Sequence, residues 1–243
     1  MKVIQFYFLF SLLLISCDRT ELDNFVGNPS ADENKPKKDT LVTKKESSSN
    51  TTAKQTNEVD LPELLLNTSV TVMNFRGNKK LGLGSGAFIG PNIVVTNYHV
   101  VEGGTRWEII RMSDKKKFTA KIKKIDKTHD VCILELVDES VDQYLKINDK
   151  YPKIGSDIMV AGSPIGLEGT ITKGNVSNIQ REEPYDYELL QISAPISPGN
   201  SGGPVVNMKG EIVGISVSAI VGQGIQNINF AVPAKYIMFL LHE

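Results

Sequence analysis

The sequence predicts an all-β fold, either a barrel or a sandwich, from about residue 61 onward. Short apolar runs recur as far as residue 233, and the segments between them are rich in Gly, Pro, Asn and Asp. This pattern is typical of antiparallel all-β folds rather than of alternating strands and helices. The expected strands cover residues 69–75, 87–89, 93–96, 107–110, 118–125, 131–137, 157–161, 171–179, 189–192, 205–207, 212–221 and 228–232.

Helices are expected only at the two ends of this region. The leucine-rich residues 61–66 suit one or two helical turns. Near the C-terminus, Ile237, Leu240 and Leu241 are spaced for one face of a helix over residues 234–241. The prediction is therefore an all-β fold with a short C-terminal helix.

Residues 1–16 are predicted to be an export signal. Lys2 supplies a positive start, and the apolar run over residues 3–15 is too short to span a bilayer comfortably. The ending Leu14-Ile15-Ser16-Cys17 resembles the lipobox of bacterial lipoproteins, which implies cleavage before Cys17 and a lipid on its thiol. We expect a membrane anchor through Cys17, on the periplasmic side or at the cell surface. Simple secretion with an incidental thiol is the alternative.

Residues 17–60 are expected to form a disordered polar tether. Asn, Ser, Thr, Lys, Asp and Glu dominate this segment, so it buries too little apolar surface to offset the entropy of ordering its backbone. A flexible coil of this length reaches roughly 35 to 40 Å. The folded domain is therefore expected to occupy residues 61–243.

Charge and cysteine content exclude several function classes. The 27 basic and 28 acidic residues give a formal net charge of −1, which offers no long-range field for nucleic acid. The two cysteines, Cys17 and Cys132, lie in very different contexts, and the sequence contains neither a disulfide framework nor a metal-ligand cluster. We expect no cofactor and no metal.

The stretch over residues 197–204, Ser-Pro-Gly-Asn-Ser-Gly-Gly-Pro, presents Ser201 on a tight, bare backbone. Glycines allow amide N–H groups to point into the same space as the hydroxyl. Acyl transfer needs such an arrangement, although a simple Gly/Pro turn between two strands would look similar.

Two further residues complete a catalytic set. His99 stands where an apolar strand ends, and Asp130 stands directly before another. Ser201 is a poor nucleophile until a base takes its proton, and the imidazole of His99 is the natural base near neutral pH. The partly desolvated carboxylate of Asp130 would hold the other ring nitrogen of His99 as a hydrogen-bond donor. The backbone N–H groups of Gly199 and Ser201 would form the oxyanion hole.

The segments over residues 96–101, 129–134 and 198–204 resemble the three catalytic segments of trypsin-like serine proteases, in particular the HtrA (Do-like) branch. The resemblance implies two six-stranded antiparallel β-barrels of the chymotrypsin type, over about residues 61–140 and 155–233. It also implies that His99 and Asp130 come from the first barrel and Ser201 from the second.

Two departures from the family pattern stand out. HtrA proteins carry PDZ domains after the protease, whereas this sequence ends at Glu243, so we expect a protease of this branch without a PDZ domain. Cys132 stands where the family tends to have Ala, and a small buried thiol suits packing there. Family members are commonly trimeric, which makes a homotrimer an implied expectation.

Several other residues could take the catalytic roles. His129 adjoins Asp130, but neighbouring strand residues face opposite ways, so His129 is predicted to be a surface residue. Asp126 is the alternative acid, and Ser85, Ser193 and Ser197 are rival hydroxyls.

Substrate preference depends on the segments that line the primary pocket in relatives, here residues 192–196, 215–217 and 228–230. They contain no acidic residue, which favours cleavage after small or aliphatic side chains rather than after Lys or Arg.

The expected function is an exported, membrane-anchored serine endopeptidase that hydrolyses peptide bonds of unfolded or exposed proteins. A non-catalytic chaperone or binding module on the same fold is the alternative. An esterase is a third hypothesis, but it would need a strand-turn-helix around the serine, and residues 205–207 are predicted to be a strand.

The direction of the Gly199 N–H decides whether the resting active site is competent for catalysis. Residues 168–173 and 181–188 are candidate regulatory loops.

Overall fold

The computed structural model describes residues 60–163, 169–182, 187–222 and 225–243, and these form thirteen strands and three helices. Residues 1–59, with the predicted export signal, Cys17 and the tether, lie outside the described part. The elements are α1 (Leu61–Thr68), β1 (Ser69–Arg76), β2 (Lys79–Gly90), β3 (Ile93–Thr96), α2 (Tyr98–Val101), β4 (Arg106–Arg111), β5 (Lys117–Asp126), β6 (Val131–Leu136), β7 (Lys146–Ile147), β8 (Asp157–Gly162), β9 (Thr170–Glu182), β10 (Tyr187–Ile192), β11 (Pro204–Asn207), β12 (Glu211–Gly222), β13 (Ile225–Pro233) and α3 (Ala234–His242).

The first six long strands close into an antiparallel barrel in the order β1-β2-β3-β6-β5-β4, hereafter the first barrel. Its interior is filled by fully buried aliphatic and aromatic side chains. Phe88 and Phe118 meet edge to face there, with ring centroids 5.7 Å apart. Aromatic pairs prefer this geometry because it brings the positive edge of one ring to the negative face of the other.

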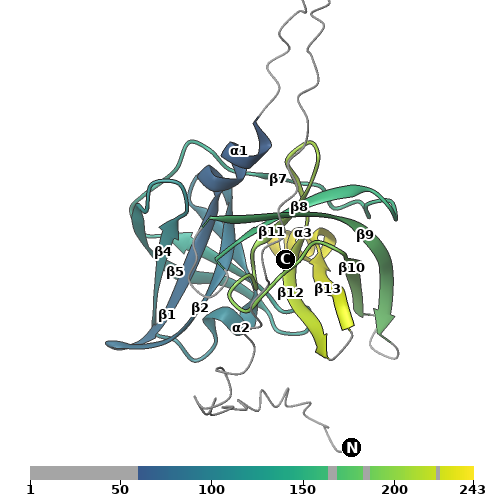
Figure 1. Ribbon diagram of the computed structural model, residues 1–243. Coiled ribbons are helices and arrows are strands. Elements are labelled where there is room, and N and C mark those ends of the chain that lie inside the picture. Colours follow the sequence, from purple (N-terminus) through teal and green to yellow (C-terminus); the bar gives the residue numbers. More distant parts are fainter. Residues whose placement is uncertain (1–59, 164–168, 183–186, 223–224) are drawn as a thin grey trace, which may run out of the picture. The chain divides into compact units, whose positions relative to one another are not determined.

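The second barrel runs β11-β8-β9-β10-β13-β12 and closes because β11 also pairs with β12. Figure 1 shows the first barrel in blue and teal and the second in green and yellow. The predicted pair of six-stranded antiparallel barrels with a short C-terminal helix is confirmed. The short strand β7, which pairs in parallel with β12, was not predicted, since two residues give no periodic signal.

The second barrel has its own apolar core, which includes Ile158, Val160 and Leu190. A third apolar cluster joins the two barrels, and the alternation of side chains along β6 explains how the first barrel contributes to it. Cys132 and Leu134 point into the first barrel, whereas Val131 and Ile133 point outward into the joining cluster. There they share a buried environment with residues of the second barrel and of α1 and α3, among them Leu65, Ile212, Ile215, Val232 and Ile237. Both faces of β6 are therefore buried, which is why it reads as a continuous apolar run.

Two local features differ from the prediction. Strand β2 begins at Lys79 rather than near residue 87. The sequence pattern does not predict this early start, because glycine-rich segments have low strand propensity. A Cβ atom on Gly86 would lie 2.7 Å from the Val95 carbonyl oxygen, so glycine permits a close approach of β2 to β3. The one-turn helix α2 was also unexpected.

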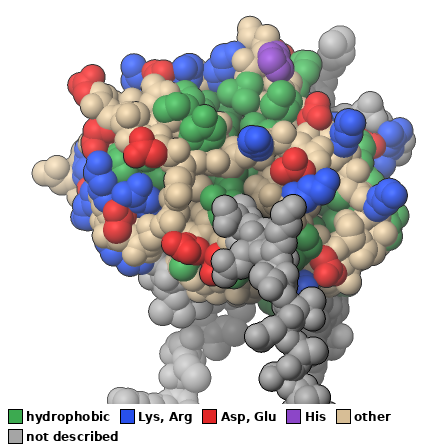
Figure 2. All heavy atoms as spheres, turned by 90° about the horizontal axis from the view of Figure 1, so that it is seen from above, with side chains coloured by type: hydrophobic (Ala, Val, Ile, Leu, Met, Phe, Trp, Pro, Cys, Tyr) green, Lys and Arg blue, Asp and Glu red, His purple; other side chains and the backbone are tan. Residues whose placement is uncertain are grey.

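Surface charge is mixed rather than segregated. Figure 2 shows Lys and Arg side chains interspersed with Asp and Glu side chains on the face that it displays. Several of these form ion pairs, such as Lys117–Glu108 and Lys123–Glu135. Within the described residues, no helix is both long and apolar enough to cross a membrane.

Candidate active site

His99 and Asp130 lie together because the strands that carry them are neighbours. His99 follows β3 on helix α2, Asp130 directly precedes β6, and these two strands pair antiparallel with Thr96 opposite Cys132. One Asp130 oxygen lies 2.7 Å from His99 Nδ1, and the other accepts the His99 backbone N–H at 2.9 Å. The carboxylate therefore fixes both the ring and its backbone, and Nδ1 carries the donated proton.

The backbone of Asp130 adopts a left-handed conformation, with φ of +55°, which Asp tolerates better than most residues. Its carbonyl oxygen accepts the Asn97 side-chain amide at 2.9 Å and the Tyr98 N–H at 3.2 Å. Asn97 is fully buried. The sequence does not identify Asn97 as a site residue. The only signal for it in the sequence is its place between strand β3 and His99.

The loop before Ser201 begins with a tight turn. The Asn200 N–H donates to the Ser197 carbonyl oxygen at 3.0 Å, with Pro198 and Gly199 between them. Gly199 has a φ of +103°, so the turn places Pro at its second position and a positive-φ Gly at its third, as a type II turn requires.

The same loop is held by one serine from each barrel. Ser85 of β2 donates its backbone N–H to the Ser201 carbonyl oxygen and its hydroxyl to the Gly199 carbonyl oxygen, both at 2.7 Å. Ser216 of β12 donates its hydroxyl to the Asn200 carbonyl oxygen at 2.6 Å. Ser85 is fully buried, so it is no longer a rival for the nucleophile.

The Ser201 hydroxyl donates to the Val217 carbonyl oxygen at 3.2 Å. Within the described residues it makes no hydrogen bond to His99. In the same part of the chain the N–H groups of Gly199 and Ser201 donate no hydrogen bond.

A second His–Asp pair lies close by. Asp126 Oδ2 lies 2.5 Å from His129 Nδ1, so Asp126 pairs with His129 and not with His99. The prediction of a surface His129 was wrong, because its side chain is only 20% exposed and its ring stacks on Tyr236 of α3 at 3.8 Å. The aromatic residues of the second barrel and its helix cover it.

Cys132 is fully buried in the first barrel, and burial raises the pKa of its thiol to about 12, which suits packing. In the predicted primary pocket, Asn229 donates its side-chain amide to the Ala194 carbonyl oxygen at 2.9 Å, and Ile192 and Ile215 are buried. No group of His, Cys, Asp and Glu suited to a metal occurs among the described residues.

The two predicted regulatory loops are largely strand where they are described. Of the first loop, residues 170–173 belong to β9. Of the second loop, residues 181 and 182 end β9, and residues 187 and 188 begin β10. Residue 168 and residues 183–186 lie outside the described part. Glu188 accepts hydrogen bonds from Lys235, Tyr151 and Arg181, which hold the pKa of its carboxyl at about 2.

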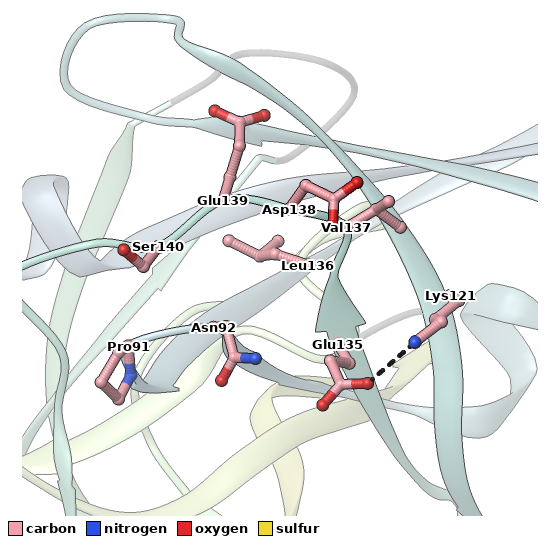
Figure 3. A pocket seen from close by; sticks show the side chains of 9 residues that line it. All are labelled: Pro91, Asn92, Lys121, Glu135, Leu136, Val137, Asp138, Glu139 and Ser140. Carbon is pink, nitrogen blue, oxygen red and sulfur yellow. Dashed lines mark ion pairs between the residues drawn. The ribbon is translucent and has the colours of Figure 1, made fainter.

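A hollow on the first barrel lies apart from these residues. Figure 3 shows it, with the ion pair between Lys121 and Glu135 at 3.2 Å on its rim. None of the predicted site residues lines it. Its lining consists of Pro91, Asn92, Lys121, Glu135, Leu136, Val137, Asp138, Glu139 and Ser140.

Residues 84–215 match the family described as "Trypsin-like peptidase domain". The chain belongs to this family, whose matched region contains His99, Asp130 and Ser201. It is 34% identical over 172 residues to "Probable periplasmic serine endoprotease DegP-like" of Pseudomonas savastanoi pv. phaseolicola, covering 69% of this chain and 36% of that protein. It is 32% identical over 164 residues to "Serine protease HtrA-like" of Staphylococcus aureus, covering 62% and 21%. The chain thus spans about a third or less of the length of these relatives.

Solved structures give the same fold. A serine endoprotease from Yersinia pestis superposes with a TM-score of 0.66 at 25% identity, over 78% of this chain and 67% of that chain. The active form of the Rv3671c protease from M. tuberculosis superposes with a TM-score of 0.68 at 24% identity, over 76% and 84%.

Proposed function

We propose that the chain is a serine endopeptidase of the HtrA-like type that cuts unfolded or exposed polypeptides. The observation that carries the proposal is the double hydrogen bond from His99 to Asp130, through the ring Nδ1 and the backbone N–H. In a neutral imidazole, a proton held on Nδ1 in this way leaves Nε2 as the nitrogen that can act as a general base. Sequence similarity to periplasmic and HtrA-like proteases supports the same activity.

In the proposed reaction, Ser201 Oγ attacks the substrate carbonyl carbon while His99 Nε2 takes its proton. The oxyanion that forms accepts hydrogen bonds from the N–H groups of Gly199 and Ser201, which have no other acceptor in the described part of the chain. His99 then protonates the leaving amine as the C–N bond breaks, and the Asp130 carboxylate stabilises the imidazolium meanwhile. Water, deprotonated by His99, finally releases the acyl group from Ser201.

Cleavage of casein by the purified chain tests this proposal. Wild-type protein is expected to degrade casein and Ser201→Ala is not. Ser113→Ala, which removes an exposed hydroxyl on the first barrel, is the matched control. Equal cleavage by wild type and Ser201→Ala would overturn the proposal.

One observation favours the alternative of a non-catalytic chaperone or binding module. The Ser201 hydroxyl is bound to the Val217 carbonyl oxygen in the resting chain. Suppression of the aggregation of an unfolded protein by both wild type and Ser201→Ala, without any cleavage, would support this alternative.

The N-terminal proposals concern export and anchoring. The similarity to periplasmic relatives supports export, and the sequence Leu14-Ile15-Ser16-Cys17 supports a lipid on Cys17. Two acyl chains or more give durable anchoring, at about 0.8 kcal/mol per buried methylene. Wild-type protein is expected in the membrane fraction and Cys17→Ala in the soluble fraction of the same cells.

A homotrimer and a preference for small or aliphatic side chains before the cut complete the proposal. The described residues within 192–196, 215–217 and 228–230 include no acidic side chain that could pair with Lys or Arg. A peptide library cut mainly after basic residues would contradict this preference, and a monomeric mass in solution would contradict the trimer.

A further inference from the structure

The buried residue Ser85 connects the first barrel to the loop that carries Ser201. Its side chain has no solvent exposure. Its hydroxyl donates to the Gly199 carbonyl oxygen at 2.7 Å and accepts the Ser163 N–H at 2.9 Å. One hydroxyl therefore joins the turn before Ser201 to the end of β8.

The backbone of Ser85 extends this connection toward His99. The Ser85 N–H donates to the Ser201 carbonyl oxygen at 2.7 Å. The Ser85 carbonyl oxygen accepts the hydroxyl of Thr96, the last residue of β3 before α2, also at 2.7 Å. A single residue is thus bonded to both sides of the proposed active site.

A second hydroxyl pair lies behind this joint. The hydroxyls of Thr71 on β1 and Ser163 lie 2.5 Å apart, and both residues are buried. Thr71, Ser163, Ser85 and the Gly199 carbonyl oxygen form a chain of hydrogen bonds between the barrels. Such chains hold their members in one arrangement when every link is made.

We infer that Ser85 is a positioning residue that sets the oxyanion hole by fixing the Gly199 carbonyl group. Gly199 has no side chain to restrict its backbone. Its carbonyl shares a peptide group with the Asn200 N–H, which donates to Ser197, so loss of the Ser85 bond would leave that group held at one end only and freer to rotate. Rotation there would turn the N–H groups of Gly199 and Ser201 away from the developing oxyanion. The inference rests on the proposed peptidase function and deepens it.

The test compares Ser85→Ala with Ser69→Ala in the full chain. Ser69 is a fair control because it is equally buried, lies on β1 of the same barrel, and its hydroxyl has no partner in the described residues. For Ser85→Ala, we expect kcat on a fluorogenic peptide to fall roughly tenfold to a hundredfold with KM nearly unchanged. Affinity for a peptide boronic acid, whose adduct with Ser201 places an oxygen in the oxyanion hole, should fall in parallel. Ser69→Ala should match wild type in both.

Thermal unfolding separates positioning from a structural role. The inference is overturned if Ser85→Ala retains wild-type kcat and boronic acid affinity, or if its loss of activity merely follows its unfolded fraction. Ser85→Cys keeps a weaker donor of similar size, and its kcat should lie between those of wild type and Ser85→Ala. If both Ser85 variants fail to fold while Ser69→Ala folds, the role is structural and the inference fails. Equal activity of wild type and Ser201→Ala would instead overturn the proposed function itself.

Discussion

The Ser201 hydroxyl donates a hydrogen bond to the Val217 carbonyl oxygen, 3.2 Å away, on strand β12 of its own barrel. In the proposed reaction this hydroxyl must instead donate to His99 Nε2 on the first barrel. The proposed reaction therefore requires the Ser201 hydroxyl to give up its hydrogen bond to the Val217 carbonyl oxygen.

This difference predicts a visible movement on inhibition. In a crystal structure of a phosphonate adduct on Ser201, Oγ is expected beyond hydrogen-bond distance of the Val217 carbonyl oxygen, because the bond to phosphorus turns it into the cleft. A crystal structure of the free protein is the control. The same Oγ position in both structures would contradict the prediction.

The two His–Asp pairs predict effects of very different size when the Asp of each pair is replaced by Asn. Asp130→Asn should lower kcat by about 10⁴-fold, since the amide favours the wrong tautomer of His99. Asp126→Asn should leave kcat within a fewfold of wild type, because Asp126 bonds to His129. Steady-state kinetics of both variants on one peptide check this, and a larger loss for Asp126→Asn would exchange the roles of the two acids.

Gly202 predicts a steric effect in the loop itself. Its φ is +85°, and a Cβ atom there would lie 2.3 Å from the Ser85 carbonyl oxygen and from Thr96 Oγ1. Gly202→Ala should therefore abolish casein cleavage. Gly155→Ala is the matched control, since Gly155 has a φ of +84° with open space around it. It should cost about 1 kcal/mol of stability and keep full activity.

Glu188 predicts a pH-dependent contribution to stability. Hydrogen bonds from Lys235, Tyr151 and Arg181 lower the pKa of its carboxyl from 4.5 to about 2 in the folded chain. A depressed folded pKa means stability that is present above pH 4.5 and lost as the pH falls toward 2. Wild type should exceed Glu188→Gln by roughly 1 to 3 kcal/mol in the free energy of unfolding at pH 7.

Chemical denaturation of both proteins at pH 7, 4 and 2.5 would measure this difference. The gap between wild type and Glu188→Gln should shrink steadily over that range. A gap that stays constant would show that Glu188 acts through packing and not through its charge.

Much of the fold was readable from local patterns. The triad candidates stood at strand ends and in a glycine turn, which are features of a few neighbouring residues. Short apolar runs between turn residues predicted the barrels, because each strand buries at least one face. The family resemblance supplied the strand count.

The missed features all depend on contacts between distant segments. The sequence offers Ser85 only as a rival hydroxyl. Nothing in residues 84–86 reveals that its hydroxyl donates to the carbonyl oxygen of Gly199, more than a hundred residues away. Strand alternation next to Asp130 predicts a surface position for His129, and nothing in the neighbouring residues shows that Tyr236 covers its ring. Strand β7 is a strand only through its parallel pairing with β12, which lies far away in the sequence.

The joining cluster between the barrels has a consequence for the newly made chain. Each barrel has its own core, but His99 and Ser201 lie on different barrels. The Ser201 loop accepts two hydrogen bonds from Ser85 of the other barrel. A chain with only one barrel folded holds half of the proposed active site. The proposed peptidase activity would therefore appear only after both barrels have folded and joined.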